Sequence, residues 1–263
     1  MALQLIENKK GTERKLEVRL AENQLEIERT LSLRYSVFNE ELGEGLAISR
    51  ATQKDRDEYD YFCDHLVVVD KSQNNAVVGT YRILKRSTAR ENIGFYSETE
   101  FDLTDLYFLE DEVAEVGRSC VHPDYRDGSV ISLLWAGLGE YMTENRIRYF
   151  MGCGSVHSTD VKSAMEAYAF MKSKDGILTD DRIRIKPRDT HRIHGFDPNY
   201  IISDMAAISK NIPPLLKGYL RLGAKVSGVP AIDLEFGTTD FFVFFDAKKI
   251  NEKYASKFLK ANA

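Results

Sequence analysis

The chain has 263 residues, of which 43% are hydrophobic and 29% are charged, so it carries enough apolar material for a core of ordinary size. Its formal net charge of −5 argues against a protein that coats nucleic acid. No apolar run reaches the ~18 residues of a membrane-spanning helix, so we expect no such helix.

The start of the chain and its cysteines indicate a cellular compartment. The first residues, MALQLIENKKGTERK, contain no apolar stretch of signal-peptide length. Cys63, Cys120 and Cys153 are far apart in the sequence and form no CxxC pair. We therefore expect a protein of the reducing cytoplasm.

Apolar periodicity predicts strands and one long helix in the first half of the chain. In chain order, the expected elements are a strand at 16–21, a helix at 22–42, an acidic loop at 54–64, a hairpin of strands at 65–70 and 76–85, an irregular stretch at 86–111 and a strand at 112–121.

Helices dominate the prediction for the second half. The expected elements are a helix at 128–146, a strand at 148–153, a helix at 160–172, a candidate strand at 182–188, a short helix at the start of 212–228, an apolar strand at 240–247 and a tail helix at 248–260. Hairpins followed by helical connections are typical of a mixed α/β sheet. We expect a single domain over 1–263, with a core over about 15–175 and a C-terminal extension over about 176–263 packed on it.

The strand at 112–121 carries two charges among apolar and small residues. Glu115 and Arg118 are three residues apart, so a regular strand would place them on opposite faces. Gly117 lies between them, and a glycine inside a strand often marks a β-bulge. We predict a bulge at or near 116–118 that turns both charges to one face. The alternative is a regular strand with the two residues in separate ion pairs.

Seven motifs in order resemble the GNAT-fold N-acyltransferases, and within them the ornithine lipid N-acyltransferases, also labelled haemolysins. These motifs are LRYSVFNEELG, YDYFCDHLVV, VVGTYRIL, FYSETEFDL, EVGRSCVHPDYR, LLWAGLGEY and PPLLKGYLRLGAKVSG, within roughly residues 30–247. A more distant resemblance is to the acyl-homoserine-lactone synthases, and it rests on Arg34, Phe38, Asp55, Asp57, Asp60, Gly79, Arg82, Glu115 and Arg118. The resemblance implies an α/β fold with a GNAT-like mixed, mostly antiparallel central sheet flanked by helices.

The resemblance also implies an activity in lipid biosynthesis. The family transfers a 3-hydroxy fatty acyl chain from acyl carrier protein to the α-amine of ornithine, which gives lyso-ornithine lipid. Glu44 stands where the lactone synthases usually have Trp, which argues against an S-adenosylmethionine substrate. Three alternatives stay open: another amine acceptor, a membrane-active haemolysin-like protein without acyltransferase activity, and a catalytically silent binding module.

The loop after the central strand bears on the acyl donor. Acetyl-CoA-dependent relatives place glycines there, and their backbone N–H groups hold the pyrophosphate. Counted from Arg126, the glycine positions fall on Ser129 and Ile131, and Gly128 alone keeps some flexibility. Acyl carrier protein presents one phosphate, so we expect it as the partner, with Val121, Arg126 and Gly128 near its phosphopantetheine. Apart from this thioester co-substrate, no cofactor is expected.

N-acylation requires a neutral amine, a stabilised oxyanion and a leaving thiolate. Glu115 is the candidate base, and a partly buried carboxylate is expected to have a raised pKa that suits this role. Arg118 is the second catalytic candidate and Ser119 a substrate-binding one. We expect backbone N–H groups of the same strand to stabilise the oxyanion.

A second group of residues has two interpretations. Arg34, Phe38, Asp57, Asp60 and Arg82 could form an amino-acid pocket, in which an arginine holds the substrate carboxylate and an aspartate holds an ammonium group. Alternatively, the charged members pair with one another and clamp the acidic loop onto the sheet.

The segment 182–194 is basic in a chain that is net acidic. Its residues Arg184, Lys186 and Arg188 could dock the acidic acyl carrier protein, or touch anionic lipid headgroups at the inner membrane. The alternative is a solvated strand edge. His191 and His194 of this segment have Asp189 and Asp197 nearby, but these residues lie in an expected loop and show no fourth-ligand pattern, so no metal site is expected.

Overall fold

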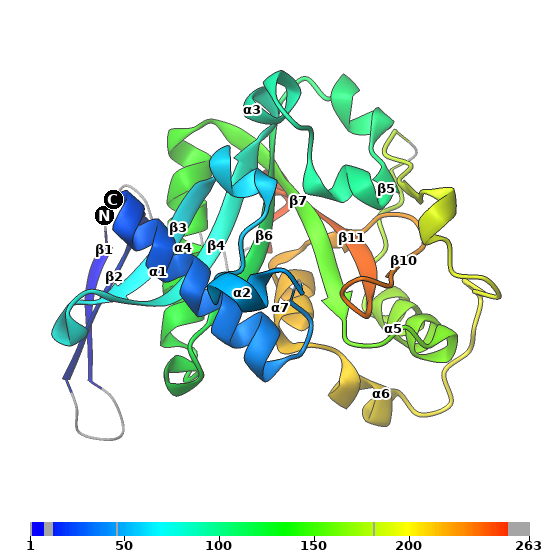
Figure 1. The fold of residues 1–263 in the computed structure, drawn as a ribbon. Coiled ribbons are helices and arrows are strands. Elements are labelled where there is room, and N and C mark those ends of the chain that lie inside the picture. The colour runs from blue at the N-terminus through cyan, green and yellow to red at the C-terminus, as the bar shows by residue number, and fades with distance from the viewer. Residues whose placement is uncertain (1, 8–12, 46, 181, 252–263) are drawn as a thin grey trace. The chain divides into compact units, whose positions relative to one another are not determined.

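The computed structural model describes residues 2–7, 13–45, 47–180 and 182–251 (Figure 1). The chain divides into two compact units. The first unit consists of Met1–Asn92, Val116–Ile147 and Ala255–Ala263, the last of which lies outside the described residues. The second consists of Ile93–Glu115 and Arg148–Tyr254. The organisation predicted from the sequence, a core with a C-terminal extension, stays a prediction.

Antiparallel strands form the sheet of the first unit. Its strands, in spatial order, are β1 (Ala2–Glu7), β2 (Glu13–Leu20), β3 (Asp64–Asp70), β4 (Ala76–Lys85) and the part of β6 (Glu112–Val121) from Val116 onward. β6 begins in the second unit and runs into the first, so the chain passes between the units within this strand.

Helices cover both faces of that sheet. The helices of the first unit are α1 (Gln24–Tyr35), α2 (Ser49–Thr52), α3 (Arg86–Glu91) and α4 (Ser129–Glu144). Leu33 of α1 packs with Val67 and Val69 of β3. Gly137 of α4 lies against Leu66 of the same strand. Neighbouring strand residues point to opposite faces, so α1 and α4 lie on opposite sides, as Figure 1 also shows.

The helix predicted at 22–42 changes its geometry partway. α1 ends at Tyr35, and the chain continues as a π-helix over Ser36–Glu41, where Leu42 N–H donates to Val37 C=O. A π-turn adds one residue per turn, and π-bulges are frequent at functional sites. The spacing of apolar residues in so short a segment is too similar in the two helix types for the sequence to distinguish a π-helix from an α-helix.

The second unit has its own antiparallel strands and helices. Its strands are β7 (Ile147–Val156), β9 (Lys225–Val226), β10 (Ala231–Asp233) and β11 (Thr238–Asp246), with a separate pair of β5 (Phe101–Asp102) and β8 (Lys186–Pro187). Its helices are α5 (Val161–Ser173), α6 (Met205–Asn211) and α7 (Pro214–Leu222). The predicted mixed α/β class with mostly antiparallel strands is confirmed.

The two faces of β11 contact different segments. Phe242 meets the ring of Phe101 from β5, with ring centroids 5.7 Å apart. On the other face, Leu216 of α7 and Val243 approach Gly154 so closely that a Cβ there would lie 2.9 Å from each. The segment that contains β5 therefore covers the Phe242 face, and α7 belongs to the core of the opposite face.

The structure differs from the predicted elements in several places. Among the described residues, the candidate strand at 182–188 pairs at Lys186–Pro187 alone. The strand β1 was not predicted. Of the tail helix predicted at 248–260, Ala247–Lys249 forms a 3-10 turn and residues 252–260 lie outside the described residues. Within the described part of the chain, no helix combines the length and apolarity needed to cross a bilayer.

The close contact at Gly137 gives a test of the packing. A Cβ there would lie 2.7 Å from the stiff side chain of Val18, so Gly137→Val should destabilise the protein by about 1–3 kcal/mol through overpacking. Urea denaturation measures this cost. Ala136→Val introduces the same side chain at the next, half-buried position of α4 and should cost clearly less. Equal costs for the two variants would contradict the packing described.

Candidate active site

The backbone of β6 is irregular where the sequence predicts a bulge. Arg118, not Gly117, adopts a left-handed conformation, with φ of 47° inside a strand. Such a conformation is strained for a residue with a side chain, at a cost of order 1–3 kcal/mol. Burial also changes here, because Val113 and Ala114 are buried whereas 116–119, which include Ser119, are half-buried. The strand is therefore irregular at Arg118, and the bulge that turns Glu115 and Arg118 to one face stays a prediction.

The side chain of Arg118 binds within the first unit. Its guanidinium forms an ion pair with Asp55 and lies over the ring of Phe38, 4.7 Å from the ring centroid. Phe38 lies in the π-helical turn after α1. The structure thus brings together two predicted site residues, and their catalytic and binding roles stay predictions.

Arg34 and Arg82 lie in a buried ion-pair network with three aspartates. Arg34 donates to Asp55 at 2.8 Å and to both oxygens of Asp60, at 2.6 and 3.2 Å. Arg82 donates to Asp57 at 2.5 Å and to Asp60 at 3.2 Å. Together with Arg118 on Asp55, three arginines balance three aspartates. Arg34 and Asp55 are fully buried.

The network fixes the acidic loop in place. Burial would raise the pKa of Asp60, but the charges of Arg34 and Arg82 outweigh it and hold that pKa well below its usual value. The Asp60 carboxylate also accepts the backbone N–H of Asp57, which closes the turn. These contacts match the clamp, the second of the two interpretations of this group. Roles for Arg34, Phe38, Asp57, Asp60 and Arg82 in substrate binding stay predictions.

Glu115, in the second unit, is held by the turn at 95–97. Its Oε2 accepts the N–H of Tyr96 at 2.7 Å, and its Oε1 accepts the N–H and the hydroxyl of Ser97 at 2.8 and 2.5 Å. The residue is 7% exposed. Three donors hold this carboxylate in one direction, and the raised pKa expected from the sequence stays a prediction. Glu115 is thus a carboxylate of fixed orientation.

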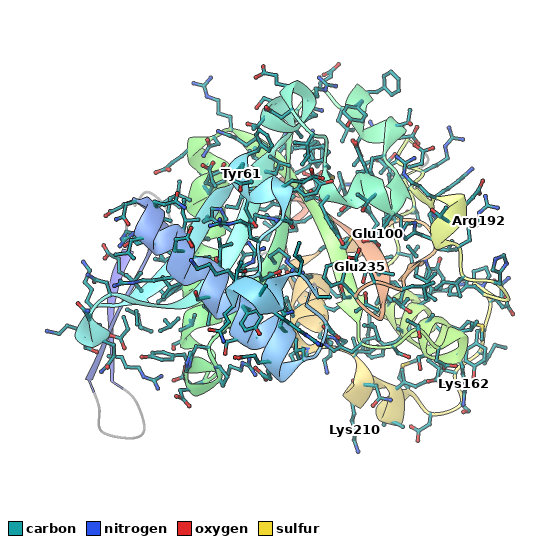
Figure 2. The ribbon with its side chains drawn as sticks, in the orientation of Figure 1. Tyr61, Glu100, Lys162, Arg192, Lys210 and Glu235 are labelled. Atoms are coloured by element: carbon teal, nitrogen blue, oxygen red, sulfur yellow. The ribbon has the colours of Figure 1, made fainter. Side chains whose placement is uncertain are left out.

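A further group of side chains continues from Ser97. The Ser97 hydroxyl lies 3.3 Å from the Cys153 sulfur, and the thiol of Cys153 faces Glu100 Oε1 at 3.8 Å. One oxygen of Glu100, one oxygen of Asp240 and the sulfur of Cys153 all lie within 4.8 Å of one another. Figure 2 shows Glu100 beside the strands of this unit. We call Glu100, Asp240 and Cys153 the acidic cluster.

The acidic cluster was not predicted, and its electrostatics are unusual. Burial, followed by the charges of Asp240 and Asp233, raises the pKa of Glu100. Burial and the charge of Asp233 also raise the pKa of Asp240. Burial and the neighbouring carboxylates raise the pKa of the Cys153 thiol. The members come from three separate segments, and no spacing in the sequence links them.

The loop before α4 differs from a pyrophosphate cradle. The side chain of Asp127 accepts the first backbone N–H of α4 at 3.0 Å, so a carboxylate already occupies part of the helix N-terminus. Gly128 has a φ of 96°. Arg126 donates to both oxygens of Glu41, at 2.5 and 2.7 Å, and to Val121 C=O at 3.0 Å. The predicted phosphopantetheine residues thus lie together, and their role is untested.

The basic side chains of 182–188 lie on one exposed face. This face, the basic edge, consists of Arg182, Arg184, Lys186 and Arg188, and the three residues between them are buried. Asp105 accepts the backbone N–H of Arg184 at 2.8 Å, and Arg188 N–H donates to Glu100 C=O at 2.7 Å. The segment is therefore extended, with alternating burial, although only two of its residues pair as a strand.

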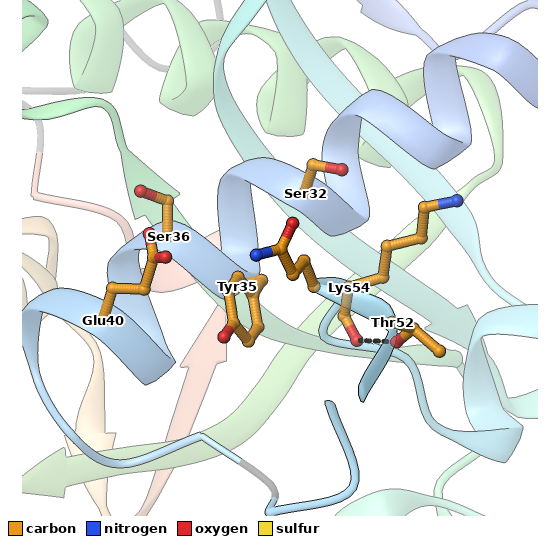
Figure 3. Close-up of a pocket in the computed structure, with 7 residues that line it drawn as sticks. Ser32, Tyr35, Ser36, Glu40, Thr52 and Lys54 are labelled. Carbon is orange, nitrogen blue, oxygen red and sulfur yellow. Dashed lines mark hydrogen bonds between the residues drawn. The ribbon is translucent and has the colours of Figure 1, made fainter. Parts of the chain in front are cut away.

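A separate polar hollow lies at the end of α1 in the first unit (Figure 3). It has a volume of about 340 Å³ and is lined by Ser32, Tyr35, Ser36, Glu40, Thr52, Gln53 and Lys54. Thr52 donates to the carbonyl of Lys54 at its rim. None of these residues was predicted to act in catalysis, and the hollow contains none of the groups described above.

Comparisons with known proteins identify the family to which the chain belongs. Residues 33–136 match the family model described as an acetyltransferase (GNAT) domain. The chain is 36% identical over 250 residues to the L-ornithine N(alpha)-acyltransferase of Brucella abortus (strain 2308), covering 92% of this chain and 88% of that protein. It is 35% identical to the L-ornithine N(alpha)-acyltransferase of Rhodobacter capsulatus, covering 90% of this chain and 92% of that protein.

A solved structure gives a fold comparison. The CoA-dependent acyl-homoserine lactone synthase BjaI, solved with MTA, superposes with a TM-score of 0.50 at 13% identity. The match covers 94% of this chain and 91% of BjaI. It supports the GNAT-like fold predicted from the sequence.

The ion-pair network predicts a pH-dependent stability. Asp60→Asn leaves buried arginine charge without its partner, so it should cost about 3 kcal/mol of unfolding free energy near pH 7. The folded-state pKa of Asp60 is lowered, so its contribution is present above the unfolded value of about 3.9 and is lost as the pH falls toward the folded value. The difference between wild type and variant should therefore shrink below about pH 4.

Urea denaturation at several pH values measures that difference. Glu58→Gln, an exposed neighbour in the same turn, is the control and should change stability by less than about 0.5 kcal/mol. A cost for Asp60→Asn that equals the control, or that does not vary with pH, would contradict the network.

Proposed function

Because the chain belongs to the family of L-ornithine N(alpha)-acyltransferases and is an acyltransferase, we propose that it acylates the α-amine of ornithine. The donor is a 3-hydroxy fatty acyl thioester of acyl carrier protein. The product is lyso-ornithine lipid. No cofactor beyond this thioester takes part in the proposal.

The proposed reaction depends on the carboxylate of Glu115, which hydrogen bonds hold in a fixed position. An ammonium group must lose a proton before its nitrogen can attack a thioester. The reference pKa of an α-amine is about 8, against about 10.4 for a lysine-like side-chain amine, so the α-amine is the easier one to deprotonate. Glu115, oriented by Tyr96 and Ser97, accepts that proton directly or through one water.

The proton that Glu115 accepts is returned later in the reaction. The neutral α-nitrogen attacks the thioester carbonyl, and backbone N–H groups of the Glu115 strand stabilise the oxyanion. Collapse of the tetrahedral intermediate forms the amide and breaks the C–S bond. Glu115 returns its proton to the departing sulfur, which leaves as the pantetheine thiol. The second proton that the attacking nitrogen must lose passes to solvent as the amide forms.

Two features favour acyl carrier protein over CoA as donor. Asp127 places negative charge at the N-terminus of α4, where CoA-dependent relatives bind a pyrophosphate, and the bulky Ile131 stands at a glycine position. The basic edge in the second unit offers positive charge to an acidic partner. A donor of this kind places the reaction in the cytoplasm, and the lipid product implies a peripheral contact with the inner membrane.

Other interpretations differ in the acceptor or in the class of protein. Another amino acid would require the same base and donor, and only the acceptor would change. Membership of an acyltransferase family argues against a membrane-active protein without catalysis and against a silent binding module.

Reconstitution tests the proposal. Purified protein, acylated acyl carrier protein and ornithine should yield N-acyl-ornithine, detected by mass spectrometry. Glu115→Gln should lower kcat by about 10²–10⁴-fold because the base is lost. Glu110→Gln, an exposed acid ahead of the same strand, is the control and should keep wild-type kcat. Wild-type kcat in a folded Glu115→Gln protein would remove the assignment of the base.

The basic edge gives a test of the donor. Reversing two of its charges, with Arg184→Glu and Lys186→Glu, should raise KM for acylated carrier protein about tenfold at low salt, because electrostatic steering is lost. The effect should fade as salt increases. Lys162→Glu, an exposed lysine of α5 in the same unit, is the control. An unchanged KM for the double variant would contradict docking at this edge.

A further inference from the structure

We propose that Glu100 and Asp240 bind the side-chain ammonium group of the acceptor amino acid. This inference rests on the proposed function and specifies which acceptors the protein selects. The pair lies in the second unit, on the same hydrogen-bonded path as Glu115.

Topology brings the two carboxylates together. Asp240 and Phe242 are two residues apart on β11 and share a face. Cys153 lies opposite Phe242 on β7. Phe101 of β5 packs on Phe242, so Glu100, which precedes it, is held against the same face. The arrangement follows from strand register and one aromatic contact.

The carboxylates lack a cationic partner within the described part of the chain. Glu100 and Asp240 are 1% and 3% exposed. Glu100 Oε2 and Asp240 Oδ1 have no hydrogen-bond partner among the described residues. The charges that act on them most strongly are acidic. Asp233, a further acid whose charge acts on both, already accepts the backbone N–H groups of Glu235 and Phe236.

The ion-pair network of the first unit provides an internal contrast. There, each buried aspartate meets an arginine, as Asp60 meets Arg34 and Arg82. Two adjacent buried acids without such a partner repel one another, and one retains a proton. A desolvated ammonium group supplies the missing charge and up to three donors.

Short contacts connect this pair to Glu115, the proposed base. From Glu115, the path runs through Ser97 at 2.5 Å and Cys153 at 3.3 Å to Glu100 at 3.8 Å. Cys153 and Ser155 are half-buried, whereas their neighbours on β7 are buried, so this face is partly accessible. A diamine whose α-nitrogen lies at Glu115 would extend its second nitrogen toward Glu100 and Asp240.

The ligand set favours an ammonium group over a metal ion. Structural zinc sites have four ligands, mostly Cys and His, whereas this cluster has one thiol, two carboxylates and no histidine. An ammonium group requires acceptors only, and carboxylate oxygens supply them. We therefore assign the cluster to the substrate.

A comparison of two acceptors tests the inference. Norvaline has the carbon skeleton of ornithine without the side-chain amine. The wild-type protein should prefer ornithine over norvaline in kcat/KM by about 10–100-fold, the range for hydrogen bonds to a charged group. Asp240→Asn and Glu100→Gln should bring that ratio toward one. Glu235→Gln, an exposed acid of the same unit, is the control and should keep the wild-type ratio.

The pH dependence of the ratio gives a second readout. The ammonium group and the retained proton compete for the same carboxylates, so ornithine binding should release a proton and the preference should grow as the pH rises. Groups that influence this response are Tyr96, Cys153 and Asp233. Effects on the α-amine are common to both acceptors and cancel in the ratio.

Binding without the acyl donor separates this inference from the proposed function. Calorimetry in two buffers of different ionisation enthalpy detects proton release by ornithine but not by norvaline. That result would support the cluster even in a protein that fails to transfer acyl groups. Equal binding of the two acceptors, or a wild-type ratio near one, would overturn it. So would a stoichiometric metal ion that is lost in Asp240→Asn.

Discussion

A carboxylate removed from water needs a positive charge, a set of hydrogen-bond donors or a proton, and this chain meets that requirement in three ways. Asp55 and Asp60 receive arginine side chains. Glu115 receives two backbone N–H groups and a serine hydroxyl. Among the described residues, Glu100 and Asp240 receive no arginine or lysine, and one oxygen of each has no hydrogen-bond partner, so a proton or a substrate cation completes them.

Each solution suits a different role. The arginine network holds the loop at Asp57 on its sheet, so its role is to stabilise the fold. Backbone donors fix the direction of Glu115, as a base with a defined position requires. The incomplete pair is the one that a ligand can complete, because a buried site that lacks a partner discriminates strongly between molecules with and without the matching group.

The sequence predicts the elements that periodicity defines. The strands near 65–70 and 76–85 and the helix near 128–146 form as expected, since alternating or helical apolar patterns match burial in β3, β4 and α4. Resemblance to a family also identified Arg34, Asp60 and Arg82 as a group, which the structure brings together.

Other features have no local signature. The π-helical turn at Ser36–Glu41 differs from an α-helix by one residue per turn, which a short stripe does not reveal. Asp240 lies in a strand that otherwise reads as apolar, and Glu100 lies in the stretch predicted to be irregular. Their contact depends on the register of β7 and β11 and on the packing of β5, which are tertiary facts.

The position of the acyl group on the product distinguishes the two nitrogens of the acceptor. In the proposed complex, the α-nitrogen lies at Glu115 and the second nitrogen lies at Glu100 and Asp240. Tandem mass spectrometry of the N-acyl-ornithine formed by the purified protein locates the amide. We expect acylation of the α-nitrogen alone, and an amide at the side-chain nitrogen would refute the proposed positions of the acceptor.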